Sequence, residues 1–412
     1  MKIGFAKREI TPPVGTELGG YAGYRPCEGI HDPLWCKVVA WEQQETLYGL
    51  VALDLMCVDE VLHQRIAEAV DIPARRLIVC SIHSHAAPQG IFPGEGPLAA
   101  VNSSSDPRHP DFSAYLESVV QQTAVAWAEA TENREAFQMY TTQGPVPLVG
   151  SERHTGADPD GNLTVLRFRT ESGKVLTVCN FPCHPTVLSA ANLQVSADFV
   201  SGLEGKLDGD MTVFLNGAAG DISTRFTRRE ATFEECDRMA AIAAEAVQKL
   251  LQGEVYKDPA PLKGIHTRIS VPARQVEAPE EAERKLRFLT EQWHQAQERG
   301  DDPAAVRIAK SYVEGAGVNL EFARTMGDIR EHRLPVTVFR IGQLHFAAVP
   351  GEMFSTIRPQ NAAVISYANG YYRYLCGEEA YEKNYYEAMA AIVARGVGEQ
   401  VKQKIEQLLA QL

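Results

Sequence analysis

The sequence lacks the features that mark three large classes of proteins. Its 40 lysines and arginines are outnumbered by 53 aspartates and glutamates, a formal net charge of -13, so no basic excess is present to bind phosphates and we expect no nucleic acid partner. No apolar run approaches the length of a membrane span. The first residues, MKIGFAKREITPP, reach charges and prolines too soon for the apolar core of a signal peptide, so we expect a cytoplasmic protein.

Paired cysteine motifs are also missing. None of the eight cysteines forms a C-x-x-C pair, and several lie in apolar runs typical of buried strands. Reduced, mostly buried thiols are the simplest interpretation, and they agree with a cytoplasmic location.

The pattern of the remaining sequence predicts an α/β fold. With 412 residues, of which 45% are hydrophobic, the chain can build a large core as one elaborate domain or two. TLYGLVALDLMCV and RRLIVCSI are typical of strands, and EVLHQRIAEAV between them is typical of a helix. A further helix is indicated by TFEECDRMAAIAAEAVQKLL, in which Thr232 and Glu235 have the spacing of a capping box.

Two segments stand out from this alternation. At about 277–330 a charged helical pair follows the strand-like GIHTRISVPA and precedes the hairpin LPVTVFRIGQLHFAAVP, so we interpret it as an insertion with solvated faces. The second segment, GIFPGEGPLAAVNSSSDPRHPD, is rich in Gly, Pro and Ser. A loop of this length is expected to be either a functional lid or a flexible surface loop.

Residues able to do chemistry stand where apolar, strand-like runs end. The run LIVCSIHSHAAPQG ends in His83 and His85, and four further runs end at Asp54, His184, Asp221 and Glu352. Because sites in α/β proteins gather at the carboxyl ends of strands, the pattern favours one shared site. For each residue taken alone, an ordinary polar strand end is an equally good interpretation.

A shared site of His83, His184 and Glu352 would match the ligands of a hydrolytic zinc centre, which leaves one position open for water. Zinc lowers the pKa of that water to about 7 and polarises the carbonyl under attack, so such a site hydrolyses amides or esters. In an extended chain alternate side chains share a face, which places His85 beside His83. If the strand stays regular, His85 lies one pleat along, too far away to share the metal easily. It would be well placed to donate a hydrogen bond to a developing oxyanion.

An ordered series of motifs resembles the neutral ceramidases and their smaller bacterial relatives. The series runs through most of the chain and consists of REITPPVGTELGGYAGY, GIHDPLWCKVVAW, SIHSHAAPQG, NFPCHPTVLSAANLQVSADF, NGAAGDISTR, VPGEMFSTI and YANGYYRY. The resemblance implies mixed β-sheets flanked by helices, in a single domain over residues 1–412. It also implies a zinc ion held by two histidines, a glutamate and a tyrosine. By motif these ligands are His83, His184, Glu352 and Tyr371, with Tyr374 as the neighbouring alternative for the tyrosine.

Two more positions follow from the resemblance. Arg153 in GSERHTG corresponds to an arginine that approaches the reacting amide, although Glu152 stands where the family usually has asparagine. Ser223 in GDISTR matches a serine proposed as a nucleophile, although Thr224 replaces the usual proline after it. We rank that role below metal-activated water, because no histidine neighbours Ser223 in sequence to act as its base.

Supporting roles are predicted for three other residues. Asp54 and Asp198 are candidates to accept the second N–H of a zinc-bound imidazole, with turn capping as an equal alternative. His31 in GIHDPLW could face the site or be an ordinary loop histidine bonded to backbone. Gly217 and Gly220 are expected to let the backbone pass close to the site.

The sequence therefore predicts a zinc-dependent hydrolase that cleaves an amide or ester bond of an N-acylated small molecule. Family members that cleave ceramide carry an additional β-sandwich domain after the catalytic part, and this chain shows none, so a more soluble acylated substrate is expected. The alternatives are a serine hydrolase using Ser223 and a binding protein that retains the fold without catalysis. A homo-oligomeric assembly is left open.

Overall fold

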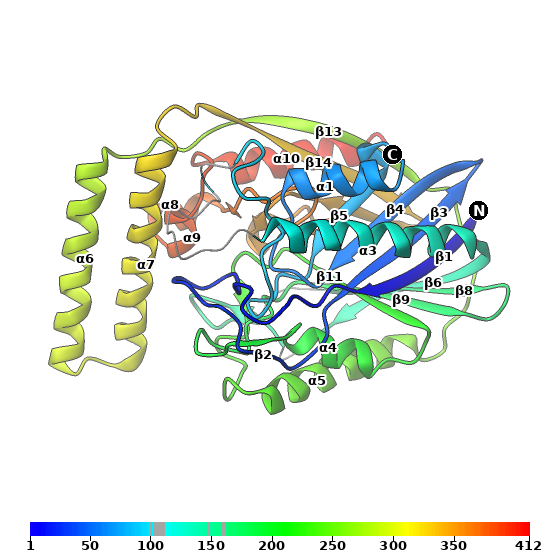
Figure 1. Ribbon diagram of the computed structural model, residues 1–412, viewed down its shortest axis with the longest axis horizontal. Helices are drawn as coiled ribbons and strands as arrows, with labels where there is room; N and C mark the ends of the chain where they lie inside the picture. Colours follow the sequence, from blue (N-terminus) through cyan, green and yellow to red (C-terminus); the bar gives the residue numbers. More distant parts are fainter. Residues whose placement is uncertain (99–100, 102–111, 147–148, 159–161) are drawn as a thin grey trace.

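A computed structural model describes residues 1–98, 101, 112–146, 149–158 and 162–412. Its largest element is an eight-stranded mixed sheet with the order β11-β9-β8-β6-β1-β3-β4-β5 (Figure 1). Neighbouring strands are antiparallel except β11 with β9 and β4 with β5, which are parallel. The strands are β1 (Lys2–Glu9), β3 (Trp35–Gln43), β4 (Thr46–Leu53), β5 (Leu77–Ser81), β6 (Glu135–Pro145), β8 (Asn162–Thr170), β9 (Val175–Phe181) and β11 (Met211–Asn216).

A second sheet packs on one face of the first. It has the order β13-β14-β15-β17, in which β15 and β17 are parallel. Its strands are β13 (Lys263–Pro272), β14 (Glu331–Ile341), β15 (Leu344–Ala348) and β17 (Ala363–Ile365). Side chains from both sheets, among them Leu50, Ile78 and Phe346, form one hydrophobic cluster between them. Three short strand pairs complete the sheets: β2 (Gly29–Ile30) with β10 (Gln194–Val195), β7 (Ser151–Glu152) with β12 (Ile222–Ser223), and β16 (Glu352–Met353) with β18 (Tyr374–Leu375).

Helices cover the opposite face of the eight-stranded sheet. These are α1 (Glu60–Ala69), α3 (Ser113–Glu132), α4 (Phe199–Gly205) and α5 (Phe233–Leu251). The alternation of side chains along the strands explains this division, because Val38 of β3 packs among the helices while Val39 packs toward the second sheet. One half of the expected capping box begins α5, where Thr232 Oγ1 accepts a hydrogen bond from the Glu235 N–H at 3.2 Å. The Glu235 carboxylate accepts from the Arg229 N–H and from Arg238 instead of from the Thr232 N–H. The predicted fold class, mixed sheets flanked by helices, is confirmed.

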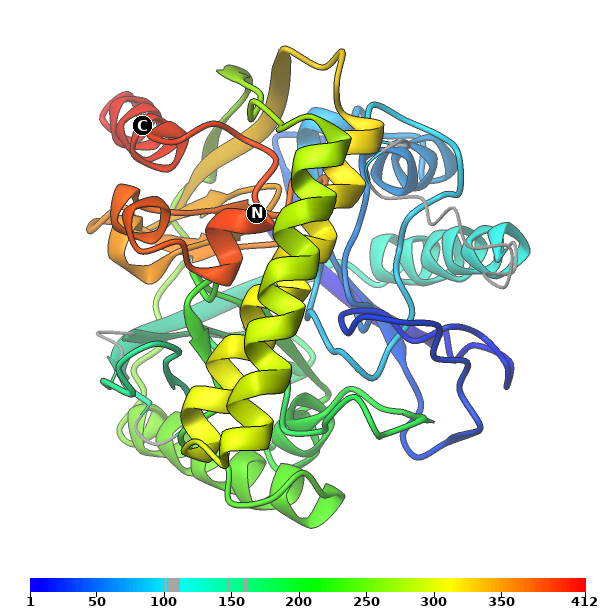
Figure 2. The same cartoon turned by 90° about the vertical axis from the view of Figure 1, so that its left-hand side faces the viewer.

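The remaining helices lie at one end of the molecule or on the second sheet (Figure 1). The helices α6 (Pro279–Arg299) and α7 (Pro303–Thr325) form a long antiparallel pair at one end of the molecule (Figure 2). In the chain, the pair is inserted between β13 and β14. Helix α7 contacts the short helix α9 (Tyr386–Met389), which follows α8 (Glu378–Glu382). The last helix, α10 (Val397–Leu409), packs on β13 and β14. Two short 3-10 helices, η1 (Ala74–Arg76) and η2 (Ser355–Ile357), occupy connections.

One irregular segment joins the two edges of the eight-stranded sheet. Residues 366–369 bond to edge strand β11 through the Ser366 N–H and the Asn216 carbonyl, at 2.9 Å. The same segment bonds to the other edge strand, β5, because Asn369 donates to the Val79 carbonyl at 2.8 Å and its side-chain oxygen accepts from the Val79 N–H. The loops that follow β5, β9 and β11 are thereby brought together, although β5 and β11 are the two ends of the hydrogen-bonded order.

Three sequence expectations concern features outside the site. All eight cysteines are free and buried, as expected. No helix among the described residues is long and apolar enough to cross a membrane. Most of the second half of the expected lid or surface loop, residues 99–100 and 102–111, lies outside the described residues, so that expectation stays a prediction.

Candidate metal centre

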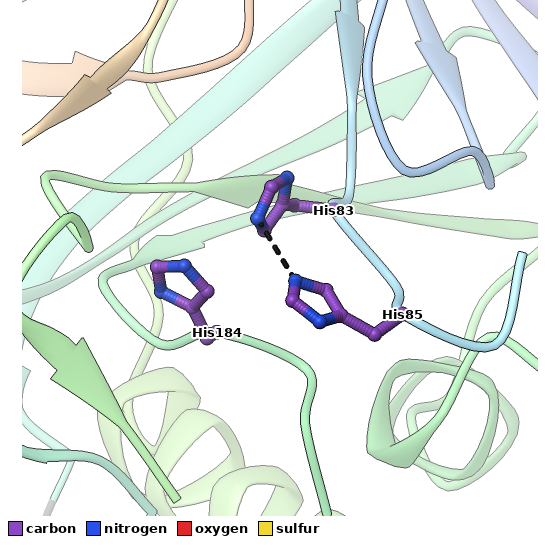
Figure 3. Close-up of side chains that lie close together, drawn as sticks. All are labelled: His83, His85 and His184. Carbon is purple, nitrogen blue, oxygen red and sulfur yellow. Dashed lines mark hydrogen bonds between the residues drawn. The ribbon is translucent and has the colours of Figure 1, made fainter. Parts of the chain in front are cut away.

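Three imidazoles from two distant segments point into one small space. His83 and His85 follow β5, His184 follows β9, and one ring nitrogen from each lies within 4.8 Å of the others (Figure 3). The Nε2 atoms of His83 and His85 are 3.2 Å apart. The Oε2 atom of Glu352, the first residue of β16, lies 3.0 Å from His184 Nε2 and 3.5 Å from His83 Nε2. The structure thus brings together His83, His184 and Glu352, with His85 beside them.

The tautomers of His83 and His184 follow from their backbone partners. His83 Nδ1 lies 2.7 Å from the Met56 carbonyl and His184 Nδ1 lies 3.0 Å from the Ile222 carbonyl. A carbonyl oxygen only accepts, so each Nδ1 carries the proton. Burial lowers the pKa of His83 to about 3, and burial followed by the charge of Arg153 lowers the pKa of His184 well below its usual value. Both rings are therefore neutral, and each directs an unprotonated Nε2 at Glu352.

This donor set fits a metal ion. Three lone pairs, from two Nε2 atoms and a carboxylate oxygen, face one another in a buried space, and a cation among them would turn their repulsion into attraction. His85 lies beside this set, with its Nε2 3.2 Å from His83 Nε2, and its Nδ1 has no hydrogen-bond partner among the described residues. The carbonyls of Met56 and Ile222 fix the ring orientations, which is the usual supporting arrangement around a metal-bound histidine.

Tyrosines enclose the carboxylate side of the cluster. Tyr371 donates its hydroxyl proton to Glu352 Oε1 at 2.6 Å, so it is the tyrosine next to the ligand set. Tyr374 lies farther along, where its hydroxyl accepts a hydrogen bond from Arg153 Nη1 at 3.3 Å. The ring of Tyr367 stacks on His83 at a centroid distance of 3.9 Å. Nothing in the sequence pattern singled out Tyr367, because aromatic residues are usually part of a core.

The backbone at the cluster differs from the extended chain assumed for His83 and His85. Strand β5 ends at Ser81, and His83 has a φ of 70°, in the left-handed region. Tyr367 and Asn369, with φ values of 55° and 61°, are also left-handed. Such conformations cost free energy in non-glycine residues and concentrate at functional sites. The two histidine rings meet because the chain turns at His83, whereas the prediction relied on a regular pleat.

Close backbone contacts need the two glycines of the NGAAGD loop. A Cβ on Gly217 would lie 2.8 Å from the Pro182 nitrogen, two residues before His184. A Cβ on Gly220 would lie 2.5 Å from the carbonyl oxygen of Glu352. The expectation that these glycines let the backbone pass close to the site is confirmed.

Arg153 lies beside the cluster in a buried ion-pair network. Its Nη1 is 3.0 Å from Glu387 Oε1, and Glu387 also lies 3.3 Å from His154 Nε2. The His154 ring stacks on Tyr385 at 3.5 Å. Burial opposes ionisation of Glu387, but His154 and Arg153 together lower its pKa to about 2, so the carboxylate stays charged. Sequence reasoning did not identify Glu387 or His154, because no spacing links them to Arg153.

Ser223 is buried near His184, and no described residue is placed to act as its base. It pairs with His184 through an isolated backbone bridge. The hydrogen bond of its Oγ within the described residues is the one that it accepts from the Arg225 N–H at 3.4 Å. No described imidazole lies within hydrogen-bonding distance of this hydroxyl.

The predicted supporting residues have other partners. Asp54 accepts from Lys37 Nζ at 2.7 Å, and Asp198 caps α4 by accepting from the Phe199 N–H at 2.8 Å. His31 stacks on Phe233. Carbonyls receive the second N–H of both imidazoles, so neither aspartate accepts from them. The capping interpretation is confirmed for Asp198. Asp54 instead belongs to an ion pair, and His31 Nδ1 lies 2.9 Å from Asp32 Oδ1 rather than bonding to backbone. Asp221, predicted as one of the strand-end residues, accepts from the Ser355 N–H and hydroxyl and contacts none of the histidines.

Comparison with known proteins identifies the fold. No family model and no curated protein sequence matches the chain. The neutral ceramidase from Pseudomonas aeruginosa superposes with a TM-score of 0.74 at 16% identity, over 99% of this chain and 73% of that chain. A ceramidase complexed with C2 superposes with a TM-score of 0.72 at 15% identity, over 99% of this chain and 74% of that chain. The chain has the neutral ceramidase fold, which confirms the structural side of the resemblance.

Proposed function

We propose that the protein is a zinc-dependent hydrolase that cleaves the amide or ester bond of an N-acylated small molecule. The observation that carries the proposal is the convergence of unprotonated His83 Nε2 and His184 Nε2 on Glu352 Oε2. We assign these three side chains as zinc ligands, with Tyr371 as the fourth. Zinc supplies the Lewis acidity that makes water a nucleophile near neutral pH.

The other side chains at the site have roles that follow from their contacts. His85, beside His83, is positioned to donate a proton or a hydrogen bond to oxygen on the substrate. The buried guanidinium of Arg153, held by Glu387, offers further N–H donors for a substrate carbonyl. Tyr374 accepts from Arg153 and orients it. A fixed set of donors of this kind stabilises negative charge that develops on a carbonyl oxygen.

The substrate class rests on the fold. Both structural neighbours are ceramidases, which supports an acylated amine as the substrate. Eight free, buried cysteines support a reducing compartment such as the cytoplasm. A soluble N-acylated compound is therefore our first choice over a membrane lipid.

The serine hydrolase alternative has less support. A serine hydroxyl needs a neighbouring base to become nucleophilic, and Ser223 Oγ meets a backbone N–H at 3.4 Å instead. We assign Ser223 a structural role, because its backbone pairs with that of His184.

Metal content and hydrolysis of an N-acyl panel, measured on the same preparations, test the proposal. The wild-type protein should carry about one zinc per chain and hydrolyse at least one linear acyl amide or ester. His83→Ala should lose both properties. His31→Ala is the matched control, because that histidine lies on Phe233 outside the site, and it should keep both. A metal-free preparation with full activity would overturn the proposal.

A further inference from the structure

An apolar cavity separate from the candidate metal centre lies between the two large sheets. Its volume is about 250 Å³, and its wall includes Leu50 and Ile78 from the eight-stranded sheet and Phe339 and Phe346 from the four-stranded sheet. Trp41 also lines it. Ile78 is near the amino end of β5, whereas His83 follows the carboxyl end of that strand. None of the residues assigned above to the metal centre lines this cavity.

Two neighbouring arginines lie at this cavity. Arg75 and Arg76 of η1 belong to its lining, together with His266 of β13. Neither guanidinium group forms a hydrogen bond or an ion pair with another side chain or carbonyl in the part of the chain that the structure describes. Nearby Arg268, by contrast, is paired with Glu60. In a chain with 53 acidic and 40 basic residues, two neighbouring unpaired guanidinium groups beside apolar surface indicate an anionic ligand.

His266 contributes a neutral polar group to the wall of this cavity. His266 Nδ1 lies 2.9 Å from Thr337 Oγ1. Burial, and after it the charges of Arg268 and Arg75, lower the pKa of His266, so the ring is neutral and the positive charge at the cavity comes from the arginines. The polar side chains of Arg75, Arg76, His266 and Thr337 come from η1, β13 and β14, and most of the other lining residues are aromatic or aliphatic.

We propose that this cavity binds a linear alkyl carboxylate, with the carboxylate at Arg75 and Arg76 and the chain between the sheets. The size of the chain follows from the volume. Since an engineered cavity of about 150 Å³ takes benzene, with six carbons, a cavity of 250 Å³ takes on the order of ten carbons. Guanidinium groups select a carboxylate over a cationic head, and the apolar wall selects an alkyl chain over a sugar or a nucleotide. The inference goes beyond the proposed hydrolase function and does not depend on the metal centre.

Quenching of tryptophan fluorescence by 10-bromodecanoate tests the proposal, because bromine quenches an indole that it touches and Trp41 lines the cavity. Saturable quenching is expected in the wild-type protein and should be largely lost in Trp41→Phe. Calorimetry with plain decanoate gives a second readout that needs no substitution. Both signals should persist after zinc is removed with a chelator, so failure of this proposal and failure of the hydrolase proposal are distinguishable.

Substitution of the arginines tests the head group. Arg75→Gln with Arg76→Gln should weaken decanoate binding roughly tenfold or more, because two charge-assisted contacts are lost. The matched control is Arg284→Gln with Arg287→Gln on exposed α6, which should leave binding unchanged. The 10-bromodecylammonium ion, of equal chain length and opposite charge, should not quench. Absence of saturable decanoate binding, undiminished quenching in Trp41→Phe, equal binding of the ammonium compound, or unchanged affinity in the Arg75 and Arg76 double variant would each overturn the proposal.

Discussion

Replacing Glu352 with glutamine should have opposite effects on the metal-free and the zinc-loaded protein. In the metal-free state Glu352 Oε2 faces the unprotonated Nε2 of His184 at 3.0 Å, and two acceptors repel each other. Tyr371 donates to Oε1 and would fix the amide so that its oxygen keeps this contact. The new NH₂ group then points at His184 Nε2 and donates to it. We expect a gain of about 1 kcal/mol, the net contribution of one hydrogen bond.

In the presence of zinc, Glu352→Gln should instead have a lower Tm than the wild type. A metal present at about 100 times its dissociation constant stabilises the wild-type fold by about 2.7 kcal/mol. With an unfolding entropy of about 2.1 cal/mol/K per residue, a chain of 412 residues converts this into a Tm rise of about 3 °C, and converts 1 kcal/mol into about 1 °C. Glu352→Gln should therefore melt about 1 °C above the wild type in chelator and show no rise with zinc.

Calorimetric melting with chelator and with excess zinc measures both effects. Asp221→Asn is the control, because Asp221 is a buried carboxylate that contacts Ser355 and none of the histidines. It should lower the Tm in both conditions and keep the zinc shift. A Glu352→Gln protein that melts below the wild type in chelator, or that still gains 3 °C with zinc, would refute the assigned tautomers or the assigned ligand.

Four further predictions concern other residues. Ser223→Ala should retain at least half of the wild-type kcat, since that hydroxyl has no base; loss of turnover with zinc still bound would restore the serine mechanism. Glu387→Gln should lower kcat/KM roughly tenfold with zinc content unchanged, because Arg153 loses a charged hydrogen bond. Glu387→Asp should recover part of this loss. Loss of zinc in Glu387→Gln would contradict the positioning role of Glu387. Lys37→Met should cost about 3–5 kcal/mol in urea unfolding, since buried Asp54 and partly buried Glu204 lose their shared cation, and a cost below about 1 kcal/mol would be inconsistent with that network. The eight buried cysteines should react with a thiol reagent only after denaturation, so fast labelling of the folded protein would contradict their burial.

Local sequence patterns predicted those parts of the fold that depend on local physical chemistry. Thr232 caps the start of α5 as the spacing indicates, because its hydroxyl needs only the nearby Glu235 N–H, whereas the Glu235 carboxylate bonds to Arg229 and Arg238 instead of completing the capping box. The strand-like runs before His83, His184 and Glu352 became β5, β9 and β15, since alternating or continuous apolar residues determine strand burial. The motif resemblance then selected the three residues that the structure brings together.

Local sequence patterns did not predict the features that depend on long-range contacts. The left-handed backbone at His83 depends on contacts with Leu55 and Met56 from another strand end, and no local signal marks it. Joining of the sheet edges by residues 366–369 depends on hydrogen bonds to β5 and β11, which are separated by more than a hundred residues in the chain. Glu387 reaches Arg153 from a short helix near the end of the chain. Each of these contacts requires the assembled fold before it can form.

The central claim is that one cation is shared by His83, His184 and Glu352. Anomalous diffraction at the zinc absorption edge, from crystals of the zinc-loaded protein, tests it most directly. We predict a single strong peak at about 2.0–2.2 Å from His83 Nε2, His184 Nε2 and a carboxylate oxygen of Glu352. A peak bound elsewhere, or none between these three side chains in a protein saturated with zinc, would contradict the account.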